Sequence, residues 1–262
     1  MRWQKLAQLI REPDTIGWRL RHKLEVQLDR HRPRPDQGFD FTCDQLSAAL
    51  AACVPGFDAG ILEDHALLQL ESEIQQRTSA LDRASAFAFA HNGDRTLGRL
   101  CYAACRSMEP DSVVETGVAH GVTTAYILLA LHQNGRGHLR SIDLPPLSSH
   151  SVDNVGIVVP ERLRDRWALY RGASREQLPK SLGDAGHVDV FVHDSLHTYS
   201  TMSWEFRTAL QKLRRPGLII SDDVEGNTAF SDMVRARKPD ESGVILESNK
   251  TACCAIALFQ SR

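Results

Sequence analysis

Residues 112–143 read SVVETGVAHGVTTAYILLALHQNGRGHLRSID, and this stretch decides the fold. Its first residues, 112–116, form a short apolar run that is typical of a buried strand. A segment with two glycines follows and predicts a loop, and residues from about 123 to 132 have the longer apolar pattern of a helix. Another short run at 138–143 predicts a second strand. This order predicts one βαβ unit with parallel strands.

The same alternation continues toward the C-terminus. We expect a helix over residues 198–213, and further strands at residues 167–170, 188–193, 218–221, 244–246 and 255–259. Strands that alternate with helices predict an α/β protein with a Rossmann-like, doubly wound and mostly parallel sheet. Ligands of such sheets bind beyond the carboxyl ends of the strands, so the residues just after each strand are the candidates for a site.

Upstream of residue 110 the pattern is mainly helical. We expect two amphipathic helices separated near Pro13, a linker at 31–38, a helix from Thr42 through about Ala52, and another over 61–76. These elements predict a helical N-terminal extension or lid over residues 1–90. The Rossmann-like core then occupies residues 91–262.

The N-terminal segment is basic. Residues 1–35 carry nine Lys/Arg and four acids, a net charge of +5, against −7 for the remainder. A basic amphipathic segment can lie on an anionic membrane surface or on a partner. We favour a helix that packs on its own domain or on a sister subunit, and we expect a homodimer.

The composition is that of an ordinary globular protein. The 262 residues are 42% hydrophobic and 24% charged with a net charge of −2, which argues against disorder and against nucleic-acid binding. Six cysteines are too few for a disulfide-stapled scaffold. No run has the length of a membrane span or of a signal-peptide core. A cytoplasmic location is therefore expected.

The loop after the first strand favours an adenosine-containing ligand. Gly117 and Gly121 allow close approach of the backbone, and Asp143 after the second strand can accept hydrogen bonds from ribose hydroxyls. Dinucleotide sites use G-x-G-x-x-G, whereas the spacing here is G-x-x-x-G with Glu115 two residues earlier. An acid there suits the ammonium and sulfonium of S-adenosylmethionine better than a pyrophosphate.

With these motifs the sequence resembles the class I S-adenosylmethionine-dependent methyltransferases. The closer resemblance is to a bacterial subfamily that includes the macrocin- and mycinamicin-type sugar O-methyltransferases. It rests on the motifs VETGV at 114–118, SIDLP at 141–145, HDSLHTY at 193–199 and SDD at 221–223. Ala119 departs from the family's glycine-rich motif at its middle glycine. The resemblance covers about residues 90–262.

The cofactor-binding residues follow from the loop, from Asp143 and from the resemblance, which adds the segment after the third strand as an adenine site. Ser174 could instead cap the next helix. The full set is Glu115, Gly117, Ala119, His120, Gly121, Thr123, Thr124, Asp143, Leu144, Gly172, Ala173, Ser174 and Asp194.

Three acids follow two neighbouring strands, Asp194 after one and Asp222 and Asp223 after the next. Such carboxylates can converge and would repel one another without a cation, and their hard oxygens suit Mg²⁺ or Ca²⁺. In the resembled enzymes acids at these positions bind Mg²⁺. The alternative is that Asp222 or Asp223 caps the next helix without a metal.

His197 lies three residues after Asp194, near the start of a helix. A histidine titrates near neutral pH and suits a general base. The macrocin-type enzymes have a histidine at this offset as the proposed base, so we predict His197 and Asp194 as catalytic residues. His193 points to the other face of its strand and is expected to serve packing.

These residues together predict S-adenosylmethionine-dependent O-methylation of a hydroxyl on a small molecule, such as a sugar or a specialised metabolite. One alternative is an NAD-dependent oxidoreductase. Another is a non-catalytic scaffold that binds the cofactor and interacts through its basic N-terminal helices.

Overall fold

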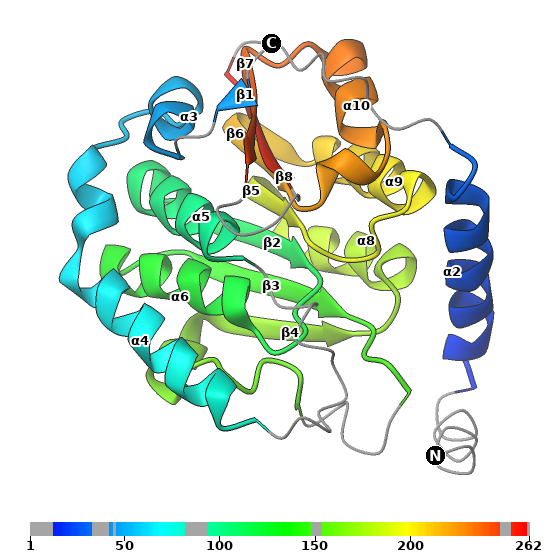
Figure 1. The fold of residues 1–262 in the computed structure, drawn as a ribbon, viewed down its shortest axis with the longest axis horizontal. Helices are drawn as coiled ribbons and strands as arrows, with labels where there is room; N and C mark the ends of the chain where they lie inside the picture. Colours follow the sequence, from blue (N-terminus) through cyan, green and yellow to red (C-terminus); the bar gives the residue numbers. More distant parts are fainter. Residues whose placement is uncertain are drawn as a thin grey trace.

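A computed structural model describes residues 13–32, 42–43, 46–81, 94–147, 154–246 and 253–260. They form an eight-stranded sheet between layers of helices (Figure 1), with the strand order β1-β7-β8-β6-β5-β2-β3-β4. The strands are β1 (Thr42–Cys43), β2 (Ser112–Thr116), β3 (His138–Asp143), β4 (Trp167–Arg171), β5 (Val188–His193), β6 (Leu213–Ser221), β7 (Glu241–Leu246) and β8 (Cys253–Phe259). Only β8 runs antiparallel to its neighbours, β6 and β7. The predicted fold class is confirmed.

The helices lie on both sides of the sheet. They are α2 (Thr15–Asp29), α3 (Leu46–Cys53), α4 (His65–Ser79), α5 (Arg95–Met108), α6 (Val122–Asn134), α8 (Ser174–Ala185), α9 (Tyr199–Leu210) and α10 (Ala229–Arg237). No helix among the described residues is both long and apolar enough to cross a membrane.

Two hydrophobic cores fill the spaces between sheet and helices. Val113 of β2 packs with α3, α4, α5 and α6 on one face, whereas its neighbour Val114 packs with α8, α9 and α10 on the other. Successive side chains of a strand point to opposite faces, so each fully buried strand supplies both cores. Strands β2, β5 and β8 are accordingly buried at every position.

The structure corrects several predicted boundaries. Thr42 does not open a helix, because Thr42 and Cys43 pair with β7 as a short strand and α3 begins at Leu46. The helix expected over 61–76 is a 3-10 turn followed by α4, since Asp64 accepts a hydrogen bond from the Ala66 amide and restarts the helix. Strand β6 begins at Leu213 rather than at 218.

Helix α2 confirms the second predicted N-terminal helix; the first lies outside the described residues. It stands beside α8 and α9 (Figure 1) and faces them with polar side chains. Glu25 accepts hydrogen bonds from Thr198 and Thr201 and lies 3.4 Å from Arg175. Burial alone would raise the pKa of Glu25, but hydrogen bonds from Arg21, Thr201 and Thr198 lower it to about 2. The helix is therefore held to the core by a buried carboxylate.

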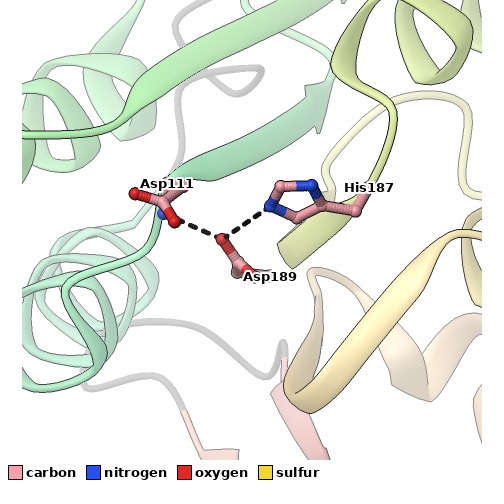
Figure 2. A group of neighbouring side chains, drawn as sticks. All are labelled: Asp111, His187 and Asp189. Atoms are coloured by element: carbon pink, nitrogen blue, oxygen red, sulfur yellow. Dashed lines mark hydrogen bonds and ion pairs between the residues drawn. The ribbon is translucent and has the colours of Figure 1, made fainter.

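At the amino ends of β2 and β5, Asp111, His187 and Asp189 lie together (Figure 2). The Asp189 carboxylate accepts hydrogen bonds from the backbone amides of Asp111 and Ser112 and lies 2.7 Å from the Arg214 guanidinium. Arg136 also pairs with Asp111. The positive charges of these two arginines balance the negative charges of Asp111 and Asp189. The hydrogen bonds of Asp189 thus join the amino end of β5 to that of β2.

Candidate functional site

A cavity of about 480 Å³ lies at the carboxyl ends of β2, β3, β5 and β6. This is where ligands bind in open α/β sheets, and its volume is within the usual range for small-molecule sites. Its lining consists of His22, Gly117, Val118, Ala119, Ile142, Asp143, Leu144, Pro146, Gly172, Ser174, Asp194, Ser195, Leu196, His197, Asp222 and Asp223.

The loop after β2 makes one wall of the cavity. Gly117 has a φ of 88°, and a Cβ there would lie 1.8 Å from the backbone oxygen of Asp194, so only glycine fits. Ala119 also has a positive φ, of 48°. At Gly121 a Cβ would lie 2.8 Å from Gly156, so this second glycine serves packing of the loop at 154–159 behind the wall.

Asp143, at the end of β3, fixes that wall. Its Oδ2 accepts hydrogen bonds of 2.8 and 3.0 Å from the amides of Val118 and Ala119. Burial raises the pKa of the Asp143 carboxyl, and these two hydrogen bonds oppose the rise. The carboxyl group still lines the cavity, where it can accept a hydrogen bond from a ligand hydroxyl.

Glu115 lies behind the wall, not in the cavity lining. Its Oε2 accepts hydrogen bonds from Thr124 of α6 and Ser141 of β3, and its side chain is fully buried. Burial raises the pKa of Glu115 to about 7 despite these bonds. Strand alternation places Glu115 on the same face as Val113, toward α6. Glu115 therefore does not face the cavity directly, in contrast to the prediction.

Other predicted cofactor residues also lie outside the lining. His120, Thr123, Thr124 and Ala173 are buried, and the His120 carbonyl accepts a hydrogen bond from the Val158 amide. Ser174 does line the cavity, but it is the first residue of α8 and Ala173 is the N-cap, so the capping alternative for Ser174 is wrong.

Four polar side chains converge at another part of the cavity: Asp194, His197, Asp222 and Asp223. The Nδ1 of His197 lies 3.0 Å from the Asp223 carboxylate, and its Nε2 lies 3.8 Å from Asp194 without a hydrogen-bond partner. Asp223 makes no side-chain cap hydrogen bond to the turn that follows it. Figure 1 shows β5 and β6 side by side at this point.

The cluster is electrostatically suited to a cation. Burial raises the pKa of Asp194 well above its usual range, and the charges of Glu115 and Asp223 raise it further. Ligand atoms of Asp194, His197 and Asp222 all lie within 4.8 Å of one another. The buried carboxylate of Asp222, the partly buried carboxylate of Asp194 and an imidazole are donors that divalent cations accept. The predicted third ligand, Asp223, forms an ion pair with His197 instead.

Beneath this cluster, Glu205 of α9 organises a buried network. It accepts hydrogen bonds from Thr116 and Ser195, and its Oε2 lies 2.7 Å from the Nδ1 of His193. Burial lowers the pKa of His193, whose ring lies edge-on to His197 at 5.3 Å. His193 thus packs beneath the site, as strand alternation predicted.

Sequence reasoning missed several lining residues, above all His22 of α2. It lies 95 positions before Gly117, the next residue of the lining, and α2 is positioned by hydrogen bonds such as Arg19 to the Pro145 carbonyl. No periodic pattern marks such a contact. Ser195 and Leu196, in contrast, lie inside the quoted HDSLHTY motif and could have been included.

Comparisons with known proteins agree with this geometry. Residues 114–224 match a protein family described as a methyltransferase domain. Curated protein sequences gave no match. Among solved structures, the O-methyltransferase TomG from Streptomyces achromogenes, determined in complex with SAM, is 16% identical with a TM-score of 0.56; the alignment covers 76% of this chain and 91% of that chain.

An O-methyltransferase from Bacillus cereus, determined in complex with SAH, is 17% identical with a TM-score of 0.56, and the alignment covers 75% of this chain and 92% of that chain. At sequence identities this low, the structural similarity shows a shared fold and no more. Residues 114–224 therefore match the methyltransferase-domain family, and the chain has the Rossmann-like fold of the methyltransferases.

Proposed function

We propose that this protein is an S-adenosylmethionine-dependent O-methyltransferase that acts on a hydroxyl of a small molecule. One observation carries the proposal: a single cavity holds both the loop fixed by Asp143 and the polar cluster around His197. The methyltransferase-domain match and the SAM and SAH complexes of proteins with this fold support it.

The adenosine end of the cofactor would lie against Gly117, Ala119, Asp143, Leu144, Gly172 and Ser174, which line one part of the cavity. Asp143 would accept hydrogen bonds from the ribose hydroxyls. The predicted residues that lie behind this lining would shape the loop rather than touch the ligand. They are Glu115, His120, Gly121, Thr123, Thr124 and Ala173. When bound, the cofactor supplies an activated methyl group.

The chain's own contribution to the reaction is orientation and proton removal. His197 lines the cavity, and Asp223 would accept a hydrogen bond from its Nδ1. The Nε2 atom, which has no hydrogen-bond partner, would then take the acceptor's hydroxyl proton. Burial would lower the pKa of His197, but Asp223 raises it above the ordinary value. His197 is the proposed general base, and Asp223 is its positioning residue.

Asp194 and Asp222 would hold a divalent cation, with Mg²⁺ the first choice because both supply carboxylate oxygens. A cation there would bind the acceptor oxygen and lower the pKa of its hydroxyl. The sequence predicts Asp223 as a third ligand. Because its carboxylate lies 3.0 Å from the Nδ1 of His197, we assign it the role of positioning the base instead.

We further propose that α2, within the predicted extension of residues 1–90, completes the acceptor side of the cavity. The elements β1, α3 and α4 of the same range pack with the core at 91–262. His22 of α2 in the lining supports this division of roles. The macrocin- and mycinamicin-type likeness makes a sugar or a specialised metabolite the proposed acceptor. A homodimer stays a prediction.

Thermal unfolding of the intact chain tests the proposal. S-adenosylhomocysteine at 100 times its Kd should stabilise the fold by about 2.7 kcal/mol, a rise in Tm of roughly 5–10 °C, while NAD gives none. Mg²⁺ after EDTA treatment should add a second rise that Asp222→Asn removes. A rise with NAD alone would contradict the methyltransferase proposal, and a rise with S-adenosylhomocysteine but none with Mg²⁺ would contradict only the metal.

A further inference from the structure

The outer face of α2 is apolar, which is the reverse of the usual arrangement of a surface helix. Leu20, Leu24 and Leu28 are 61%, 59% and 58% exposed, and Ile16 is 39% exposed. They recur every four residues and form one stripe along the helix, which we call the α2 stripe. An exposed apolar stripe of this kind marks an interaction surface rather than a random feature.

The inner face of α2 explains why the stripe faces outward. Glu25 accepts hydrogen bonds from the hydroxyls of Thr198 and Thr201, and Asp29 accepts one from the backbone amide of Tyr199. Both acids of the helix are thus directed into the body of the protein. Rotation of α2 to bury the stripe would remove these partners from a buried carboxylate, at a large cost in stability.

The charges left at the outer surface are basic. Lys23 and Arg30 are exposed on one side of the α2 stripe. Arg21 and Arg32 lie on the other side, where they are half-exposed and pair with Glu25 and Asp29. An apolar stripe bordered by cations on both sides is the pattern of a helix that lies in the interface of an anionic membrane. Each cation near such a surface adds to binding.

We propose that the α2 stripe docks this protein on an anionic lipid surface. A second copy of the chain fits less well, because two stripes in contact would bring their basic borders together. The stripe is also one helix wide, whereas a stable dimer buries about 800 Å² per partner. The leucines would enter the apolar edge of the bilayer while the cations contact lipid phosphates.

Sedimentation of the full chain with vesicles tests the proposal. The protein should bind vesicles of phosphatidylcholine with phosphatidylglycerol, bind phosphatidylcholine vesicles at least about 10-fold more weakly, and lose its affinity as salt rises. Leu20→Glu/Leu24→Glu should reduce binding at least about 10-fold. The matched control Leu68→Glu/Leu246→Glu changes leucines that are 42% and 45% exposed elsewhere, and should bind like the unchanged protein.

A charge pair of variants separates specific docking from general attraction. Lys23→Glu should weaken binding roughly fivefold or more, whereas Lys212→Glu, an exposed lysine at the opposite end of the sheet, should not. Failure to bind anionic vesicles, or equal loss in the α2 variants and their controls, would overturn the proposal. So would a change of solution mass from dimer to monomer in Leu20→Glu/Leu24→Glu, which would assign the stripe to a second copy.

Discussion

Glu115 shows how a single buried side chain can be misread from its position in a motif. It follows the apolar run of β2 directly, which suggested contact with the ligand, yet the two-residue alternation of the strand turns it toward Thr124 of α6. The sequence contained this information, because Glu115 shares its face with Val113. The missed inference concerned the direction of the side chain.

The buried Glu115 carboxyl predicts a specific pH dependence. Its pKa is about 7 in the folded protein against 4.5 when unfolded, so the stability that it contributes is full below pH 4.5 and is lost as the pH rises through 7. Glu115→Gln should remove this loss, worth up to about 3 kcal/mol. Urea unfolding of both proteins at pH 5 and pH 8 measures it, and an equal change in the two would contradict the assignment.

Ala119 carries backbone strain in the same loop. Its φ of 48° costs an L-residue about 1 kcal/mol relative to glycine. Ala119→Gly should therefore raise the free energy of unfolding by roughly 0.5–1 kcal/mol in the absence of ligand. A control at Ala130, fully buried in the middle of α6, should lose stability on change to glycine. A loss of stability at both positions would show that the loop is unstrained.

Among the elements, three central strands could be predicted from the sequence residue by residue. Strands β2, β3 and β5 have the predicted bounds, whereas β7 and β8 begin three and two residues before the predicted starts at 244 and 255. The start of β6 and all of β1 were missed. Half-buried Leu213, the exposed residues 214–216 and the two residues Thr42–Cys43 become strands only by pairing with neighbours. Pairing of this kind has no local signal.

Helix α2 is attached to the core through its polar face. The helical spacing of its leucines was visible, but it gave no hint that the polar face would be the inner one. We expect Glu25→Ala to loosen α2, because Thr198 and Thr201 lose a charged acceptor. Amide exchange across Thr15–Asp29 should quicken at least about 10-fold, while Gln27→Ala on the outer face leaves it unchanged. Unaltered protection in Glu25→Ala would contradict this account of the attachment.

The strand ends in Figure 2 offer a stability test that is independent of the site. Asp189 is 2% exposed and holds two backbone amides beside Arg214. Asp189→Asn should lower the free energy of unfolding by about 2–4 kcal/mol. Asp111→Asn, whose exposed carboxylate pairs with the same arginine, should cost less than about 1 kcal/mol. Equal losses in denaturant unfolding would refute the role of burial.

For the whole molecule, the sequence predicted where the site lies better than which side chains line it. The rule that ligands bind at the carboxyl ends of parallel strands located Asp143, Asp194, Asp222 and Asp223, and all four line one cavity. It could not predict His22, whose place depends on hydrogen bonds between α2 and distant loops. It also could not predict that the Asp223 carboxylate lies 3.0 Å from His197, because that contact depends on side-chain rotation.

The most direct test of the central claim is isothermal titration of S-adenosylhomocysteine into the intact chain and into Asp143→Asn. The account predicts one binding site per chain, no binding of NAD, and a Kd at least about 10-fold weaker in Asp143→Asn, because a charged acceptor for the ribose hydroxyls is lost. Asp165→Asn, away from the cavity lining, should bind like the unchanged protein. Absence of S-adenosylhomocysteine binding, or an unchanged Kd in Asp143→Asn, would contradict the account.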